Sequence, residues 1–69
     1  VPEEAARRAI QAYNRGVDLA AQGHLEPAIA SYQQAIALNP TLVQAYNNLA
    51  NLYEQTQRVP EALATYQAA

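Results

Sequence analysis

Apolar residues between positions 28 and 40 recur at helical spacing. They stand at i, i+1, i+4, i+7 and i+8, which puts their side chains on one face of an α-helix. These residues are Ala28, Ile29, Tyr32, Ala35 and Ile36. Asn39 and Pro40 follow, and a proline disfavours helical dihedral angles in the residue before it. The pattern therefore predicts a helix that begins near Glu26-Pro27 and ends at Asn39.

The same pattern returns further along the chain. Residues 62–69 match residues 28–35 in type at six positions, and Asn48 repeats Asn14. A fixed period of roughly 34 residues is typical of helix pairs that stack into a solenoid, because each unit buries its apolar face only against a neighbour. We therefore predict an all-α fold, an α-solenoid of stacked antiparallel helix pairs with about four helices.

Residues typical of helix ends predict a first helix before residue 26. Pro2 with the acidic Glu3 is typical of a helix start, and the helix should run to about Gln22. Gly16 in its middle weakens a helix by about 1 kcal/mol relative to alanine, so we expect a close helix crossing there. Gly23 is suited to the left-handed conformation that ends a helix.

Two more helices follow. Thr41 with Gln44 three residues later predicts a capping box for the third helix, which should end near Thr56. The expected buried face of that helix is Val43, Tyr46, Leu49, Ala50 and Tyr53. A fourth helix should open at Pro60-Glu61 and run to Ala69.

Composition and charge narrow the classes of ligand. The 69 residues carry a net charge of −2 and no lysine, so the chain is poorly suited to nucleic acid. Without cysteine it has neither disulfides nor thiolate metal ligands. No apolar run approaches the roughly 20 residues of a membrane span, and no targeting segment is visible. We therefore expect a cytoplasmic protein without membrane insertion.

Catalytic and metal-binding patterns are weak. His24 is the only histidine and falls in a predicted turn, and Ser31 is the only serine, with no histidine at helical spacing. Glu3 and Glu4 are better explained as a favourable helix start than as acid–base groups. We expect no enzymatic activity, no metal site and no cofactor.

Small, aromatic and leucine residues and a closing proline stand at fixed places in the two units: Gly16, Ala28, Tyr32, Ala35, Pro40, Tyr46, Leu49, Ala50, Tyr53, Ala62, Tyr66 and Ala69. This pattern resembles the tetratricopeptide repeat (TPR). The resemblance implies a first repeat over residues 9–42 and a second over residues 43–69, truncated in its helix B. Ala12 and Arg15 depart from the large aromatic and the leucine of the family pattern. Residues 1–8 are then an extension of the first helix, and this repeat is expected to start the array.

The resemblance also implies a binding groove on the concave face of the A helices. Its residues here are Tyr13, Asn14, Val17, Gln44, Asn47, Asn48 and Asn51. Asn14 and Asn48 are similar to the asparagine ladder in the repeat domain of protein O-linked N-acetylglucosamine transferases, although asparagine is also simply common at this position. The family's clamp of basic residues is not expected, because Tyr13 and Val17 occupy its positions.

Two function classes stay open. The first is a protein–protein interaction module that binds an extended peptide of a partner along this groove. The alternative is a structural or oligomerisation unit of a longer repeat scaffold without a specific groove ligand. Independently of this choice, we expect Leu63 and Tyr66 to be only partly covered, which favours self-association through the C-terminal helix; the alternative is a frayed fourth helix on a monomer. The sequence leaves open a catalytic domain elsewhere in a longer parent chain.

Overall fold

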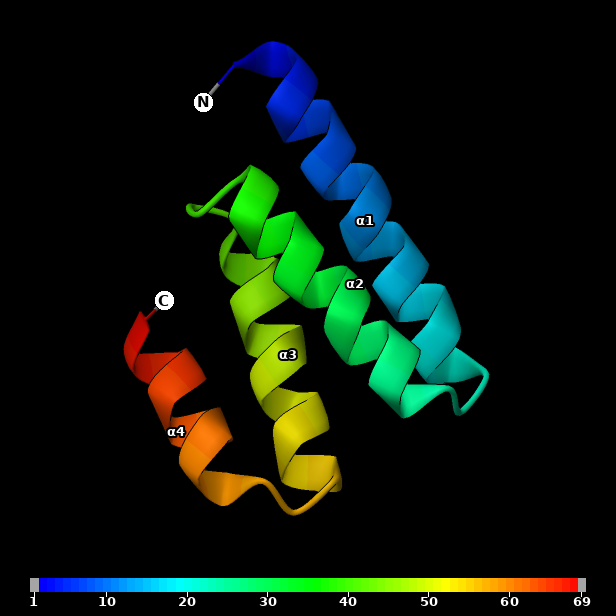
Figure 1. Cartoon of the computed structure of the whole chain (residues 1–69), viewed down its shortest axis with the longest axis vertical. Helices are drawn as coiled ribbons and strands as arrows, with labels where there is room; N and C mark the ends of the chain where they lie inside the picture. The colour runs from blue at the N-terminus through cyan, green and yellow to red at the C-terminus, as the bar shows by residue number, and fades with distance from the viewer. Residues whose placement is uncertain (1, 69) are drawn as a thin grey trace.

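The computed structural model describes residues 2–68, which form four α-helices (Figure 1). They are α1 (Glu3–Ala21), α2 (Leu25–Leu38), α3 (Val43–Gln55) and α4 (Val59–Ala68). The described residues contain no strand, so the all-α prediction is confirmed. Helix boundaries lie within about two residues of those expected, the usual scatter for helix ends. The predicted end of the fourth helix, Ala69, lies outside the described residues.

Each helix packs against the next one along the chain. The contacts join α1 to α2, α2 to α3, and α3 to α4, so α2 lies between α1 and α3. Figure 1 shows this order directly, with the helices following one another across the molecule from α1 to α4. This is the predicted arrangement of stacked antiparallel pairs.

The two turns inside the helix pairs share one geometry at equivalent positions of the repeat. The amide of His24 donates to the carbonyl of Leu19 over 2.9 Å, and that of Arg58 donates to the carbonyl of Tyr53 over 2.6 Å. Gly23 has a φ of 83°, as predicted for a left-handed helix end. Gln57 occupies the equivalent position with a φ of 62°, a conformation that side chains disfavour.

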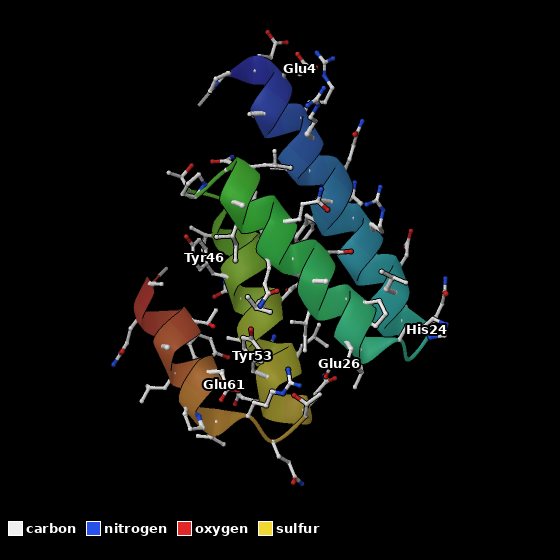
Figure 2. The ribbon with its side chains drawn as sticks, in the orientation of Figure 1. Glu4, His24, Glu26, Tyr46, Tyr53 and Glu61 are labelled. Atoms are coloured by element: carbon white, nitrogen blue, oxygen red, sulfur yellow. The ribbon has the colours of Figure 1, made fainter. Side chains whose placement is uncertain are left out.

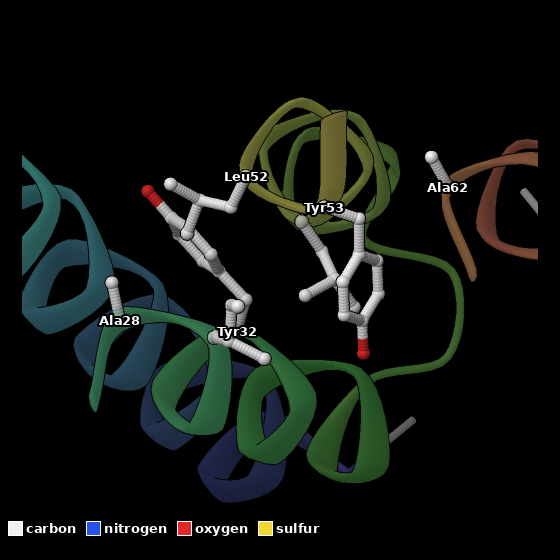
Figure 3. Close-up of a cluster of buried hydrophobic side chains, with 7 residues drawn as sticks. Ala28, Tyr32, Leu52, Tyr53 and Ala62 are labelled. Carbon is white, nitrogen blue, oxygen red and sulfur yellow. The ribbon is translucent and has the colours of Figure 1, made fainter. Parts of the chain in front are cut away.

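The core lies where α2 meets its neighbours. Tyr32 is 2% exposed, and a Cβ placed on Gly16 would come within 2.6 Å of the Tyr32 Cε1 atom. The mid-helix glycine therefore permits the close approach of α2, as predicted. Figure 3 shows Tyr32 of α2 and Tyr53 of α3 in the main cluster. The buried members of that cluster are Ala28, Ile29, Tyr32, Leu49, Leu52, Tyr53 and Ala62.

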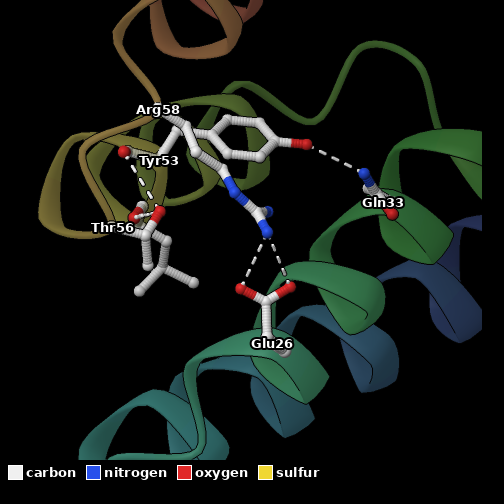
Figure 4. A network of polar contacts seen from close by, with 6 residues as sticks. Glu26, Gln33, Tyr53, Thr56 and Arg58 are labelled. Carbon is white, nitrogen blue, oxygen red and sulfur yellow. Dashed lines mark hydrogen bonds and ion pairs between the residues drawn. The ribbon is translucent and has the colours of Figure 1, made fainter.

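Polar contacts join α2 to the second pair. Arg58 Nη2 lies 3.1 Å from Glu26 Oε2, and the amide of Gln33 donates to the Tyr53 hydroxyl over 2.9 Å (Figure 4). Both contacts link residues 20 or more positions apart in the sequence. The two repeats are thus held together by side-chain hydrogen bonds as well as by the core.

Two predictions about α3 were wrong. Leu42, not Thr41, caps the helix, and no side-chain hydrogen bond is made there. Thr41 instead uses its backbone amide and hydroxyl to contact Asn39 Oδ1, at 3.2 and 2.7 Å. The Thr41 hydroxyl, which a capping box requires, is therefore hydrogen-bonded to the Asn39 side chain instead.

The predicted buried face of α3 is confirmed at Leu49, Ala50 and Tyr53 but was wrong at its N-terminal end. Val43 is 52% exposed, and Tyr46 is half-buried with its hydroxyl donating to the carbonyl of Pro40 over 2.9 Å. Ala45 and Leu52 are buried instead, at 0% and 4% exposure. The reason is that α3 buries one side against α2 and another against α4, so its apolar residues do not form a single stripe.

Candidate functional site

The seven predicted groove residues lie on α1 and α3, and we call them the groove face. Tyr13 and Asn48 are half-buried, and the other five are exposed: Asn14, Val17, Gln44, Asn47 and Asn51. The exposed members on α3 all carry side-chain amides, which offer both donors and acceptors.

The side chain of Asn48 is hydrogen-bonded to two tyrosines. Its Nδ2 donates to the hydroxyl of Tyr13 over 3.1 Å and to that of Tyr32 over 3.3 Å. The two rings lie side by side, with centroids 5.7 Å apart and planes tilted by 46°. Both amide hydrogens of Asn48 are therefore engaged, whereas no hydrogen bond from residues 2–68 reaches its Oδ1. The tyrosines leave Asn48 able to act as an acceptor.

The surroundings of Tyr32 favour its protonated form. Burial raises the pKa of Tyr32 above its ordinary value of 10.0, the hydrogen bond from Asn48 lowers it by less, and the neighbouring Tyr13 raises it. The Tyr32 hydroxyl therefore stays protonated at neutral pH. A protonated phenol can accept from Asn48 while keeping its own hydrogen available.

Asn51 has a different partner. The hydroxyl of Tyr66 lies 3.0 Å from Asn51 Oδ1 and 2.7 Å from Glu54 Oε1. The hydrogen bond to Glu54 raises the pKa of Tyr66. Because a hydroxyl has one hydrogen, the shorter contact with the carboxylate holds it more strongly. The carbonyl of Asn51 is therefore only partly engaged by this contact.

The two asparagines of the proposed ladder are not equivalent in the structure. Asn14 is exposed and makes no side-chain hydrogen bond within residues 2–68, whereas Asn48 is half-buried and held by Tyr13 and Tyr32. Sequence reasoning placed Tyr32 in the core but missed its contact with Asn48. No sequence pattern signals this contact, because it joins residues of two helices that only the packing brings together.

Other features of the described residues bear on metal binding and membrane insertion. His24 is exposed in the turn between α1 and α2 (Figure 2). The described residues contain no cluster of three or more side chains suited to a metal ion. Of the helices within residues 2–68, none combines the length and apolarity that crossing a membrane requires.

Comparison with known proteins agrees with the period and the fold. The family model described as TPR repeat matches residues 16–57, which is more than half of the chain. This chain belongs to the tetratricopeptide repeat family. TPR repeats generally serve as protein-interaction modules, and the prediction of a helical repeat protein is confirmed.

One curated relative is a plant TPR protein. The chain is 36% identical over 58 residues to tetratricopeptide repeat domain-containing protein PYG7, chloroplastic, of Arabidopsis thaliana. The alignment covers 83% of this chain but 19% of that protein, so the chain spans about a fifth of its relative. No solved structure gives a significant match. Because the name of the relative places that protein in the chloroplast, the expected cytoplasmic location stays a prediction.

Proposed function

We propose that the groove face binds an extended peptide segment of a partner protein, with the side-chain amides pairing with the peptide backbone. The observation that carries this proposal is the fixed orientation of Asn48. Its two amide hydrogens bind Tyr13 and Tyr32, and its carbonyl oxygen accepts nothing from residues 2–68. An acceptor fixed in advance loses less conformational entropy when a ligand binds.

The two asparagines then take different roles. Asn48 accepts a hydrogen bond from a peptide N–H, and the exposed Asn14 provides both a donor and an acceptor. The sequence expectation gave Asn14 and Asn48 one shared role, by resemblance to O-linked N-acetylglucosamine transferases; the relative identified is instead a chloroplastic TPR protein, and only Asn48 is held by tyrosines. Because two repeats offer a small interface, we expect dissociation constants on the order of micromolar or weaker.

Backbone recognition is tested with a neutral peptide and its N-methylated counterpart. The probe is acetyl-Thr-Val-Thr-Val-amide, and its binding is monitored in two-dimensional NMR by the backbone amide signals of α1 and α3, which every variant retains, and in the unmodified chain also by the side-chain amides of Asn14 and Asn48. The unmodified peptide should shift these signals, and N-methylation should abolish the effect because it removes the backbone donors. The double variant Asn14→Ala, Asn48→Ala should lose binding, each hydrogen bond contributing about 0.5–1.5 kcal/mol.

A matched control separates the groove face from amides in general. Gln11→Ala removes an exposed amide of α1 outside the groove face and should leave the peptide-induced shifts unchanged. Circular dichroism should show the same helicity for every variant. Equal responses to the two peptides, or unchanged binding in the double variant, would contradict the proposal.

A second candidate function, self-association through α4, is favoured by one specific observation. Leu63 is 58% exposed and Tyr66 is 44% exposed, whereas the equivalent residues of α2, Ile29 and Tyr32, are 4% and 2% exposed beneath α3. The outer face of α4 is therefore an apolar surface of the kind that a neighbouring helix covers one repeat earlier. The proposed occupant is α4 of a second copy of this chain.

Sedimentation tests this second candidate. At about 100 micromolar, where weak contacts become populated, the unmodified chain should form dimers. Leu63→Glu should keep it monomeric, while Ala64→Glu, at an exposed position next to it on α4, serves as the control. A monomer for the unmodified chain would exclude self-association.

A further inference from the structure

The first and third helices differ on the side that faces away from the next repeat. On α3 and at its N-cap, the residues packed toward α2 are apolar: Leu42, Ala45, Leu49 and Leu52. Their equivalents one repeat earlier are Arg8, Gln11, Arg15 and Asp18. We call these four residues the outer face of α1.

A hollow of about 280 Å³ lies beside this face, between α1 and α2. Its lining residues are Arg8, Gln11, Ala12, Arg15, Gln34 and Leu38. Ala12 explains the free space, because the equivalent position in the second repeat carries the much larger Tyr46. The hollow thus combines an apolar part at Ala12 and Leu38 with two guanidinium groups and two amides.

The four arginines of the chain differ in whether they form an ion pair. Arg7, Arg8 and Arg58 pair with Glu3, Glu4 and Glu26 at distances of 3.5, 2.8 and 3.1 Å. Arg15 pairs with no carboxylate among residues 2–68. Arg15, the one arginine without such a pair among residues 2–68, therefore keeps its N–H donors available at the edge of the hollow. A guanidinium has five N–H donors in a planar fork that matches a carboxylate.

We propose that this hollow binds a carboxylate-bearing segment of a partner protein, with Arg15 pairing with the carboxylate and an apolar side chain of the segment covering Ala12 and Leu38. Gln11 and Gln34 provide neutral hydrogen bonds to the segment's backbone. The apolar part favours a peptide over a free phosphate, which has no group to place there. This site lies outside the groove face and does not depend on the function proposed for it.

The test is an NMR titration of the chain with acetyl-Leu-Glu-Leu-amide. We expect saturable shifts of the Gln11, Ala12 and Arg15 backbone amides and of the Gln34 side-chain amide, with a dissociation constant on the order of millimolar. Acetyl-Leu-Gln-Leu-amide, which lacks the charge, should bind about five-fold more weakly, the upper range for an exposed ion pair. Raising the salt from about 50 to about 300 mM should weaken only the charged peptide.

Two arginine variants make the test specific. Arg15→Gln should raise the dissociation constant about five-fold for the charged peptide and leave the neutral one unaffected. Arg7→Gln removes the same charge from α1 outside the hollow and should bind like the unmodified chain. Both positions are exposed, so neither change should alter the circular dichroism spectrum.

The remaining outcomes overturn the proposal. If the two peptides bind equally well, or if Arg15→Gln and Arg7→Gln have the same effect, Arg15 does not recognise a carboxylate. If inorganic phosphate at matched ionic strength saturates these signals and the charged peptide does not, the hollow is a phosphate site and not a peptide site.

Discussion

Gly16 and Tyr32 are in direct contact across the α1–α2 crossing, with no room between them for a side chain. A Cβ on Gly16 would lie 2.6 Å from Cε1 and 2.7 Å from Cδ1 of the Tyr32 ring. At the equivalent crossing in the second repeat, Ala50 and Tyr66 take these positions, and Tyr66 is 44% exposed. Position 50 already carries a Cβ, so the second pair does not require glycine at its crossing.

Gly16→Ala should destabilise the chain. Because Tyr32 is buried, we expect a loss of about 1 kcal/mol, since overpacking costs about 1–3 kcal/mol and alanine's higher helix propensity offsets about 1. Urea denaturation followed by circular dichroism measures the change. In a Tyr32→Leu background the same substitution should cost much less, and an equal cost would show that the ring is not the obstacle.

A glycine in place of Gln57 should stabilise the turn between α3 and α4. Gln57→Gly should raise the free energy of unfolding by about 0.5–1 kcal/mol, because it removes a left-handed strain of about 1–2 kcal/mol while increasing the entropy of the unfolded chain.

The reciprocal change at the equivalent turn is the control for Gln57. Gly23→Gln should lower the stability by about 1 kcal/mol through backbone strain alone, since a Cβ there would meet nothing within 4 Å. Thermal unfolding of both variants measures the pair. If both substitutions shift the stability in the same direction, the left-handed conformation is not the cause.

Stability should fall at alkaline pH through Tyr32. Its pKa is raised in the folded state, so the unfolded chain loses this proton first. The stabilisation is complete below the unfolded value of about 10 and declines as the pH rises through the folded value. Melting temperatures should drop from pH about 9 to about 11, and less so in Tyr32→Phe. An equally steep drop in that variant would assign the effect to another group, and Tyr46→Phe provides the matched control.

Removing the Tyr32 side chain should unfold the domain. Tyr32 is 2% exposed and belongs to the main core cluster, so Tyr32→Ala should cost about 3–5 kcal/mol, comparable with the whole stability of so small a chain. Circular dichroism at 25 °C should show most of the helix signal lost. Tyr46→Ala, at a half-buried position outside both core clusters, should retain it.

The sequence by itself determined the number of helices, their limits and the family. These features depend on local signals and on the repeat: the helical spacing of apolar residues, the prolines at 40 and 60, Gly23, and the return of the same residue types at a fixed period. Local signals are reliable here because a helix end needs only the backbone preferences of a few neighbouring residues. The close crossing at Gly16 was also predictable, since glycine inside a helix has a cost that packing must offset.

Only the tertiary structure decided that Ala45, and not Val43, belongs to the buried face of α3, and what Asn48 binds. Apolar residues surround α3 on more than one side, so the position of α2 determines that Ala45 is covered while Val43 is not. Likewise, Asn48 can bind Tyr13 and Tyr32 only because the packing of three helices brings these residues together from positions 35 and 16 residues away. Such contacts depend on how whole helices are placed relative to one another, and no local sequence pattern predicts that placement.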